Sequence, residues 1–368
     1  MRGGFAGLAN LMNFRLFGKS KAVVGLDIGS SAVKAVELRP SGKTFKVAAF
    51  GIEPVPPDSI VDGAIIDAGA VTESIRRVFE NKAFKSKEVA ASLSGSAVIV
   101  KKISLPVMTA AELDESIYWE AEQYIPFDIQ DVNLDYQILD AGTGADSKGT
   151  MEVLLVAAKK EKIADYTGVV AQAGRVPVVV DVDAFALQNA YEVNYGFEPG
   201  TVVVLLNAGA SAINVNIING SQSVFTRDVS IGGNAYTEAV QREMNLPFDA
   251  AEALKKGRAI DGATFEDTLP VLRAMTDNVL LEVQKTFDFF KATASSERID
   301  RIVLSGGASR VHGFGEMLQD RFGTPIEDFD PFRRISVDTK KLSSEQREAI
   351  GSTGAVAVGL ALRRAGDR

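Results

Sequence analysis

The stretch VVGLDIGSSAVKAVEL, residues Val23–Leu38, recurs in a weaker form as VVLLNAGASAINVNII, residues Val203–Ile218. Each residue of the copy lies 180 positions after its counterpart (207 − 27), and Gly29 and Gly209 are among the identical pairs. This repeat, at about half the chain length, predicts a fold of two similar halves. Each copy has the pattern of a strand, a turn of small residues and a second strand. Such turns let backbone N–H groups approach phosphate oxygens, so two facing turns would hold a nucleotide.

Composition narrows the class of protein. The chain has 368 residues, enough for two or more domains with a substantial core. Its net charge of −8 disfavours a bulk nucleic-acid-binding surface. Without cysteine there is no disulfide framework and no thiolate metal site, which fits a cytoplasmic protein. His312 is the only histidine, so multi-histidine metal centres are excluded, and we interpret it as a polar loop residue. No stretch approaches ~20 uninterrupted apolar residues, so no transmembrane helix is expected.

The first 21 residues, MRGGFAGLANLMNFRLFGKSK, mix basic and apolar side chains. They fit an amphipathic membrane-surface segment, a flexible tail, or a mis-assigned start with translation beginning at Met12. The tail and the later start are favoured over the membrane anchor. The apolar run is too short and too broken for a secretory signal.

Hydrophobic periodicity predicts the same order of elements in both halves: three strands, a helix, a strand, a helix, a strand and a helix. The predicted elements of the first half are strands at 22–27, 32–39, 44–52, 87–93 and 176–181 and helices at 70–81, 160–173 and 184–194. Those of the second half are strands at 201–207, 212–218, 223–230 and 302–305, a short strand at 326, and helices at 234–244, 313–321 and 352–364.

A different insertion interrupts each half. Residues 97–158 predict a strand–helix–strand–strand unit, whose helix begins after Thr109 with Glu112 at the capping-box position. Residues 232–300 predict a helical insertion. The expected division is therefore a leader at 1–21, a first lobe at 22–96 plus 159–198, its insertion at 97–158, a second lobe at 199–231 plus 301–351, its insertion at 232–300, and a closing helix at 352–368 that packs back on the first lobe.

This duplicated α/β order, with these turns, resembles the actin-like ATPase superfamily from Ala22 onward. Within it the chain is similar to the PilM family of type IV pilus assembly. The motifs that carry the resemblance are GLDIGSSAVKAVEL after LFGKSK, YWEAEQYIPFDIQDVNLDYQIL, VDVDAFALQNAYE, FTRDVSIGGNAYTEAVQ and LSGGASRVHGFGEMLQDRFGTPIEDFDPF. The helix followed by IPF separates this family from sugar kinases and chaperones. The resemblance implies an actin-like, ribonuclease H-like fold with two lobes around a nucleotide cleft, and ATP and Mg²⁺ as cofactors.

The first turn carries candidate phosphate and metal ligands. Asp27 ends a strand at the turn, where a carboxylate can hold Mg²⁺ through water. Gly29, Ser30 and Ser31 would donate backbone N–H and hydroxyl groups to phosphate. Lys34 would either reach the β- or γ-phosphate or face solvent. A tight hairpin with a capping Asp is the plain structural alternative, and the duplicate turn favours the functional interpretation.

The second turn contains Asn207, Gly209, Ala210 and Ser211. The superfamily usually has an Asp at the position of Asn207, and that Asp helps to place the metal and the attacking water. Asn cannot act as a base, so binding of ATP is expected with slow or absent hydrolysis. Asp183 is the candidate catalytic acid that remains, although it could also cap the following helix. Asp181 would point to the same side as Asp183 if the strand continued.

Two further glycine pairs complete the expected site. Gly306, Gly307 and Ala308 resemble the adenosine motif of the superfamily, although an ordinary strand–helix turn is the alternative. Gly232 and Gly233 open a helix whose N-terminus could face phosphate.

The first insertion suggests a partner. Trp119 and its aromatic neighbours are interpreted mainly as core of the insertion. In the PilM family this insertion borders a groove for the N-terminal cytoplasmic peptide of the inner-membrane protein PilN. That peptide would dock the chain peripherally on the inner-membrane pilus platform. Pilus motor ATPases and self-association are further options. A polymerising FtsA-like division protein, a platform component of a type II-like secretion system and a small-molecule kinase are the alternative functions.

Overall fold

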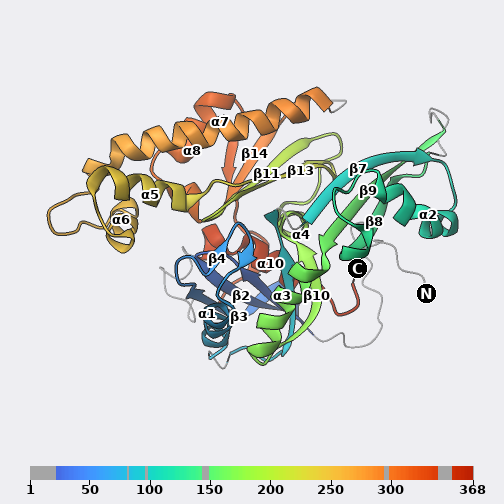
Figure 1. Cartoon of the computed structure of the whole chain (residues 1–368), viewed down its shortest axis with the longest axis horizontal. Coiled ribbons are helices and arrows are strands. Elements are labelled where there is room, and N and C mark those ends of the chain that lie inside the picture. The colour runs from blue at the N-terminus through green and yellow to red at the C-terminus, as the bar shows by residue number, and fades with distance from the viewer. Residues whose placement is uncertain are drawn as a thin grey trace.

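The computed structural model describes residues 22–80, 83–95, 98–142, 149–293, 298–338 and 350–367. The leader at 1–21, the predicted helix end at 81 and the predicted insertion start at 97 lie outside the described residues. Two large sheets form the body of the molecule, and a smaller three-stranded sheet projects from one side (Figure 1). The described residues contain no helix with the length and apolarity that a membrane crossing needs.

The two large sheets share one topology, which confirms the predicted order of strands. Each has an antiparallel three-stranded meander whose first strand also pairs with a parallel strand. The first sheet has the order β10 (Val176–Val182), β6 (Glu88–Leu93), β1 (Val24–Ile28), β2 (Ala32–Ser41), β3 (Thr44–Pro54), β16 (Ile335–Ser336). The second has the order β13 (Gln222–Val229), β12 (Ile213–Asn219), β11 (Val202–Ala208), β14 (Arg301–Ser305), β15 (Ile326–Asp328). The short β16 was not predicted, and it joins the second half of the chain to the first sheet.

Helices cover both faces of each sheet. The outer face of the first sheet packs on α1 (Ala68–Val78) and α3 (Lys160–Gln172) through one apolar cluster. Between the two sheets lie α4 (Asp183–Tyr195) and α10 (Ala355–Ala361), whose apolar side chains share a cluster with β2 and β11. The outer face of the second sheet is covered by α5 (Gly233–Met244), α7 (Leu269–Thr293) and α8 (Phe314–Phe322), and α6 (Phe248–Lys255) packs on α5 (Figure 1). The predicted limits of the lobes stay a prediction.

The closing helix α10 approaches its neighbours at backbone distance. A Cβ atom on Gly25 of β1 would lie 2.1 Å from the carbonyl oxygen of Ala357, and one on Gly359 would lie 1.7 Å from that of Ala186 in α4. Only glycine permits such contacts. Beyond the helix, Arg363 forms a 2.8 Å ion pair with the buried Asp181 of β10. The end of the described chain is therefore built into the first lobe.

The inserted subdomain contains β7 (Val98–Pro106), α2 (Ala110–Glu122), β8 (Val132–Asp140) and β9 (Thr150–Lys159). Its strands have the order β7-β9-β8. The predicted capping box is confirmed: Glu112 N donates to Thr109 Oγ1, and Thr109 N donates to Glu112 Oε2. A small hairpin of β4 (Ile60–Val61) and β5 (Ala64–Ile65), in the first lobe, was not predicted.

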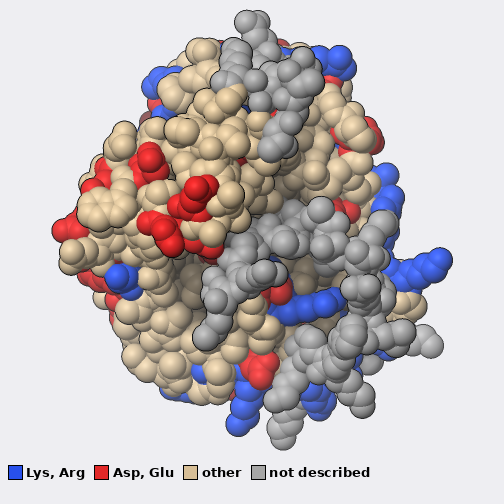
Figure 2. Space-filling model, turned by 90° about the vertical axis from the view of Figure 1, so that its right-hand side faces the viewer, with Lys and Arg blue, Asp and Glu red and all other residues tan. Residues whose placement is uncertain are grey.

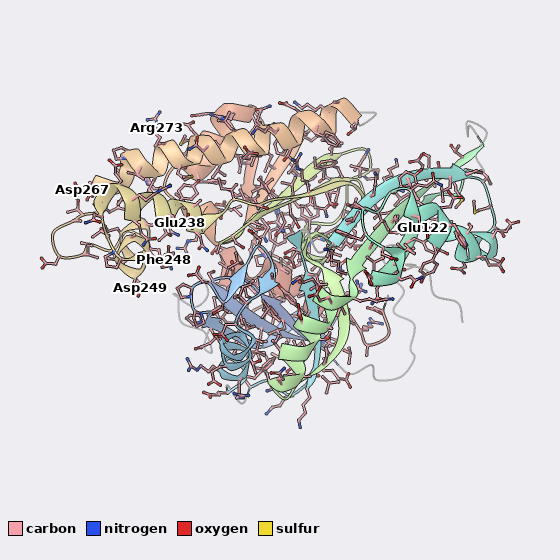
Figure 3. All side chains as sticks on the ribbon, viewed as in Figure 1. Glu122, Glu238, Phe248, Asp249, Asp267 and Arg273 are labelled. Carbon is pink, nitrogen blue, oxygen red and sulfur yellow. The ribbon has the colours of Figure 1, made fainter. Side chains whose placement is uncertain are left out.

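The expectation that Trp119 and its neighbours form mainly core of this subdomain is confirmed for Tyr124, Ile125 and Phe127 and is wrong for Trp119 and Tyr118. Trp119 is 73% exposed and Tyr118 is 51% exposed, so neither belongs to the core. The buried face of α2 consists of Leu113, Ile117 and Ala121, which recur every four residues, and Trp119 lies between these positions on the other side of the helix. Figure 2 faces this side of the molecule and shows Asp and Glu side chains gathered there. Glu122, at the end of α2, is one of the acidic residues of the subdomain (Figure 3).

Candidate nucleotide site

A cavity of about 910 Å³ lies between the two sheets and is lined from both lobes. Nearly all of the predicted site residues line it: Asp27, Gly29, Ser30, Ser31, Lys34, Asp183, Asn207, Gly209, Ala210, Ser211, Gly233, Gly306, Gly307 and Ala308. Gly232 is the predicted residue that does not. Residues predicted from sites far apart in the sequence therefore meet at one cavity.

The two turns have the same internal geometry. Gly29 N donates to Ala32 O at 3.1 Å in the first turn, and the equivalent bond from Gly209 N to Ala212 O is 2.9 Å long. Within the part of the chain that the structure describes, the next two amides of each turn donate to no protein acceptor. These four free amides belong to Ser30, Ser31, Ala210 and Ser211. They are available to anionic oxygen atoms in the cavity.

A direct contact joins the turns across the cavity. Ser30 Oγ donates to Ser211 Oγ at 3.0 Å, and these residues are 181 positions apart. The predicted facing arrangement of the two turns is thus present in the structure.

Asp27 and Lys34 form an ion pair at the first turn. Lys34 Nζ lies 3.0 Å from Asp27 Oδ2, and the side chains are only 13% and 12% exposed. The two residues are register partners in the antiparallel β1–β2 pair. The solvent-facing option for Lys34 is therefore wrong, and a contact of Lys34 with phosphate stays a prediction. Lys34 lines the same cavity as the residues of the four free amides.

The second turn replaces this ion pair with two amides. Asn207 and Asn214 occupy the equivalent register positions of β11 and β12, and Asn207 Nδ2 donates to Asn214 Oδ1 at 3.0 Å. The exchange removes one negative and one positive charge together, so the second turn stays neutral. The repeat itself holds this signal, because Asn214 lies 180 positions after Lys34, yet sequence reasoning noted only Asn207.

Asp183 lies on the cavity wall, and Asp181 does not. β10 ends at Val182 and α4 begins at Asp183, so the strand alternation that would align the two acids stops between them. Asp183 accepts a 2.5 Å hydrogen bond from Ser92 Oγ. The cap position of α4 is Val182, so Asp183 is not the cap residue. Burial, with added repulsion from Asp27, raises the pKa of Asp183 to about 7.

The raised pKa of Asp183 predicts that the protein loses stability as pH rises from about 4 to about 7. The carboxyl group has a usual pKa of 3.8 and one of about 7 in the fold, so in this window the folded state binds the extra proton. Each increase in pH therefore favours unfolding. Asp183→Asn should flatten this decline when the denaturation midpoint is followed between these pH values.

Glu192 serves as an internal reference for this measurement. Burial raises its pKa to about 7 as well, so it contributes the same slope in both proteins. The difference between the two profiles then reports Asp183 alone. Parallel profiles would contradict the assignment.

The insertion of the second lobe supplies residues that sequence reasoning left off the site. Lys255 Nζ donates to Gly233 O at 2.9 Å and to Thr237 Oγ1 at 2.8 Å, and it lies 2.5 Å from Glu252 Oε2. Burial lowers the pKa of Lys255. Glu252 and Lys255 line the cavity, and Glu238 does not. Figure 3 shows Glu238 on α5 and Phe248 and Asp249 at the start of α6.

His312 lies in an exposed turn, as predicted, and it also lines the cavity. Its ring meets that of Phe265 edge-on, with the centroids 5.6 Å apart. Both lie in the second lobe, on the wall that also contains the Gly306–Ala308 motif. The ring pair adds an aromatic surface to this end of the cavity.

The glycines of the second lobe bring backbone segments together. Gly306 has a φ of +92°, and a Cβ atom there would lie 2.2 Å from Ala208 O. A Cβ atom on Gly232 would lie 2.6 Å from Gly209 O. Gly233 N and Asn234 N donate to Gly209 O and Ala210 O, respectively.

This packing corrects the expectation that α5 offers its first amides to phosphate. Those amides already bind the carbonyl groups of the second turn. Gly233 stays on the cavity wall, and Gly232 acts by letting α5 pack against the turn.

The acidic residues suit a hydrated cation better than an enclosed one. Among the residues that the structure describes, no three acidic, histidine or cysteine side chains cluster closely enough to hold a metal ion. Mg²⁺ commonly keeps several waters and uses one or two carboxylates. Asp27, with Asp183 and Asp228 also lining the cavity, fits that mode of binding.

A family model described as Type IV pilus assembly protein PilM matches residues 25–365. The chain belongs to the PilM family. A similar chain in the solved "PilM-PilN type IV pilus biogenesis complex" is 32% identical in sequence, with a TM-score of 0.83. The alignment covers 94% of this chain and 98% of that one.

More distant structures share the fold of this PilM family member. The ethanolamine utilization protein EutJ from Carboxydothermus hydrogenoformans is 14% identical, with a TM-score of 0.55 over 93% of this chain and 89% of its own. MreB5 of Spiroplasma citri, solved bound to ADP, is 13% identical, with a TM-score of 0.51 over 93% of this chain and 95% of its own. The predicted actin-like fold is confirmed.

Proposed function

We propose that this chain is an ATP-binding, actin-like protein of the type IV pilus assembly platform, with slow or absent ATP hydrolysis. The observation that carries the proposal is the pair of facing turns, whose four free amides border one cavity together with Lys34. Membership of the PilM family supports the pilus role. The proposed location is the cytoplasmic side of the inner membrane, where a partner holds the protein.

Different residues would bind the phosphates, the adenosine and the metal ion. The four free amides and Lys34 Nζ would donate to the phosphate oxygens, and the Gly306–Ala308 segment would lie against the adenosine. Asp27 would accept hydrogen bonds from water molecules on Mg²⁺, which neutralises phosphate charge when it is bound. Lys34 can leave Asp27 for a phosphate because both partners then gain a new counter-charge. Asn207 has no charge with which to activate water, and Asp183 is left as the candidate that orients it.

Equilibrium binding tests the nucleotide proposal. The purified protein is titrated with ATP in Mg²⁺ and in EDTA by calorimetry, and release of phosphate is followed in the same samples. Saturable binding of one ATP per chain, strengthened by Mg²⁺ and with little turnover, is expected. No binding at millimolar ATP would overturn the proposal. Filaments that sediment with ATP and without a partner would favour the FtsA-like alternative.

We further propose that the inserted subdomain docks the N-terminal cytoplasmic peptide of PilN. The 32% identical relative belongs to a PilM-PilN complex, and the exposed Trp119 and Tyr118 supply apolar surface on α2. Exposed aromatic residues of this kind commonly carry much of the affinity of a peptide interface.

Trp119→Ala should weaken binding of a PilN N-terminal peptide by about tenfold or more. The melting temperature should stay within about 2 °C of wild type, because a side chain that is 73% exposed contributes little to the core. Fluorescence anisotropy of a labelled peptide measures the affinity. Leu281→Ala is the matched control, since Leu281 is 50% exposed on α7 of the other lobe. Equal affinities of the two variants would place the peptide elsewhere.

A further inference from the structure

A chain of polar side chains crosses the second sheet and ends on the first lobe. Ser305 Oγ donates to Asn207 Oδ1 at 3.3 Å, and Asn207 Nδ2 donates to Asn214 Oδ1 at 3.0 Å. Asn214 Nδ2 then donates to Asp228 Oδ1 at 2.8 Å, and Asp228 Oδ2 accepts a hydrogen bond from Gly95 N. Four neighbouring strand positions and one loop of the first lobe are thereby linked.

The Asp228 carboxylate determines which group donates and which accepts in each hydrogen bond of this series. A carboxylate has no hydrogen to donate, so Asn214 must present its NH₂ group to Asp228. The carbonyl oxygen of Asn214 then faces Asn207, and Asn207 must donate a hydrogen bond to it from its own NH₂ group. The oxygen of Asn207 is left on the opposite edge, toward Ser305. Amide orientation follows from such networks, and Asp228 is the member that has no alternative orientation.

Asp228 also contacts the loop whose Ser94 hydrogen-bonds to Asp183. Gly95 N donates to Asp228, and the neighbouring Ser94 hydroxyl binds Asp183. Ser94, Gly95, Asp183 and Asp228 all line the cavity. Asp228 therefore lies where the second turn meets the candidate acid of the first lobe, although it is distant from both in sequence.

We propose that Asp228 is a positioning residue of the nucleotide site, which orients Asn207 so that its carbonyl oxygen, and not its NH₂ group, is the acceptor that the second turn offers. This oxygen receives one hydrogen bond from Ser305 Oγ and has a second lone pair available. This inference rests on the proposed function. An acceptor oxygen at this position can receive a hydrogen bond from a water molecule on Mg²⁺, as Asp27 can at the first turn. The second half of the site thus keeps an acceptor after losing its acid.

The isosteric variant Asp228→Asn makes the argument testable. Gly95 N still needs an acceptor, so the new amide would turn its oxygen to Gly95 and its NH₂ group to Asn214. Asn214 and Asn207 would then both reverse, and Asn207 would point its NH₂ group away from Asn214. Shape and packing stay the same, but the second turn would offer a donor to water molecules that are themselves donors.

The experiment compares nucleotide affinity with and without Mg²⁺. ADP is titrated by calorimetry into wild type, Asp228→Asn and the control Asp320→Asn, which removes one charge from an exposed position of α8. We expect Mg²⁺ to strengthen binding about tenfold less in Asp228→Asn than in wild type, the loss of one hydrogen bond to a charged group. Affinity in EDTA should be unchanged, and Asp320→Asn should match wild type throughout.

Each other outcome counts against a specific statement. An unchanged Mg²⁺ effect in Asp228→Asn, or an equal loss in Mg²⁺ and EDTA, would overturn the positioning role. Failure of wild type to bind ADP in either condition would overturn the proposed function, and this inference with it. If Asp228→Asn does not fold, Asn214→Leu interrupts the same chain and should show the same selective loss of the Mg²⁺ effect.

Discussion

Asn207→Asp alone is expected to destabilise the protein by about 2 kcal/mol, because the new carboxylate would face an acceptor and not a donor. Asn214 presents Oδ1 to position 207, and its NH₂ group is held by Asp228. The added negative charge would also lie in a cavity that Asp27 and Asp183 already line. Turnover of ATP should therefore rise little in the single variant.

The double variant Asn207→Asp with Asn214→Lys should reverse this outcome. It copies the Asp27–Lys34 pair at the equivalent register of the second turn, and the new lysine would also contact Asp228. Stability should return to near wild type, and a carboxylate able to activate water should raise ATP turnover by about 100-fold. Chemical denaturation and phosphate release measure the two effects. A fully stable single variant, or a double variant without added turnover, would refute this account of the second turn.

Gly232→Ala is expected to cost about 2–3 kcal/mol of stability and to abolish tight nucleotide binding. The added Cβ atom would lie 2.6 Å from Gly209 O and 2.7 Å from Ala210 O. Either α5 or the second turn must move, and the two free amides of that turn would move with it. Denaturation with urea gives the stability, and titration with ATP gives the affinity.

Gly168→Ala is the matched control for this prediction. Gly168 lies within α3, and a Cβ atom there would meet nothing within 4 Å. Alanine in a helix is favoured over glycine by about 1 kcal/mol, so this variant should gain stability and bind ATP as wild type does. Equal stability and equal ATP affinity of the two variants would show that close packing at Gly232 is not required for folding or for nucleotide binding.

Local patterns in the sequence predicted most of the fold. The repeat of the first turn indicated the two sheets, and the Thr109–Glu112 pair indicated the start of α2. Each copy of the repeat is a short contiguous stretch, and the Thr109–Glu112 pair spans three positions, so both can be recognised without knowing any contact in the fold. The pairing of β16 with β3 joins Ile335 to Phe45 through a strand of two residues, and so short a strand has no periodicity to detect.

The site was predictable where it follows the repeat and unpredictable where it depends on distant contacts. Both turns and the Gly306 motif were found by their residue types. The bond between Asp228 and Gly95 joins residues 133 positions apart, and nothing local marks Asp228 as a partner of the cavity. The exposure of Trp119 was not predicted for another reason. The interpretation followed the usual burial of aromatic residues and not the four-residue spacing of the buried α2 face.

The packing of α10 has a consequence for how the protein is made. The first lobe contains β1, which emerges early from the ribosome, yet its core needs β16 and the backbone contacts of Gly359 with α4. A first half without these later residues would therefore expose part of its apolar surface. A fragment that stops at the middle of the chain should therefore not fold into a stable half.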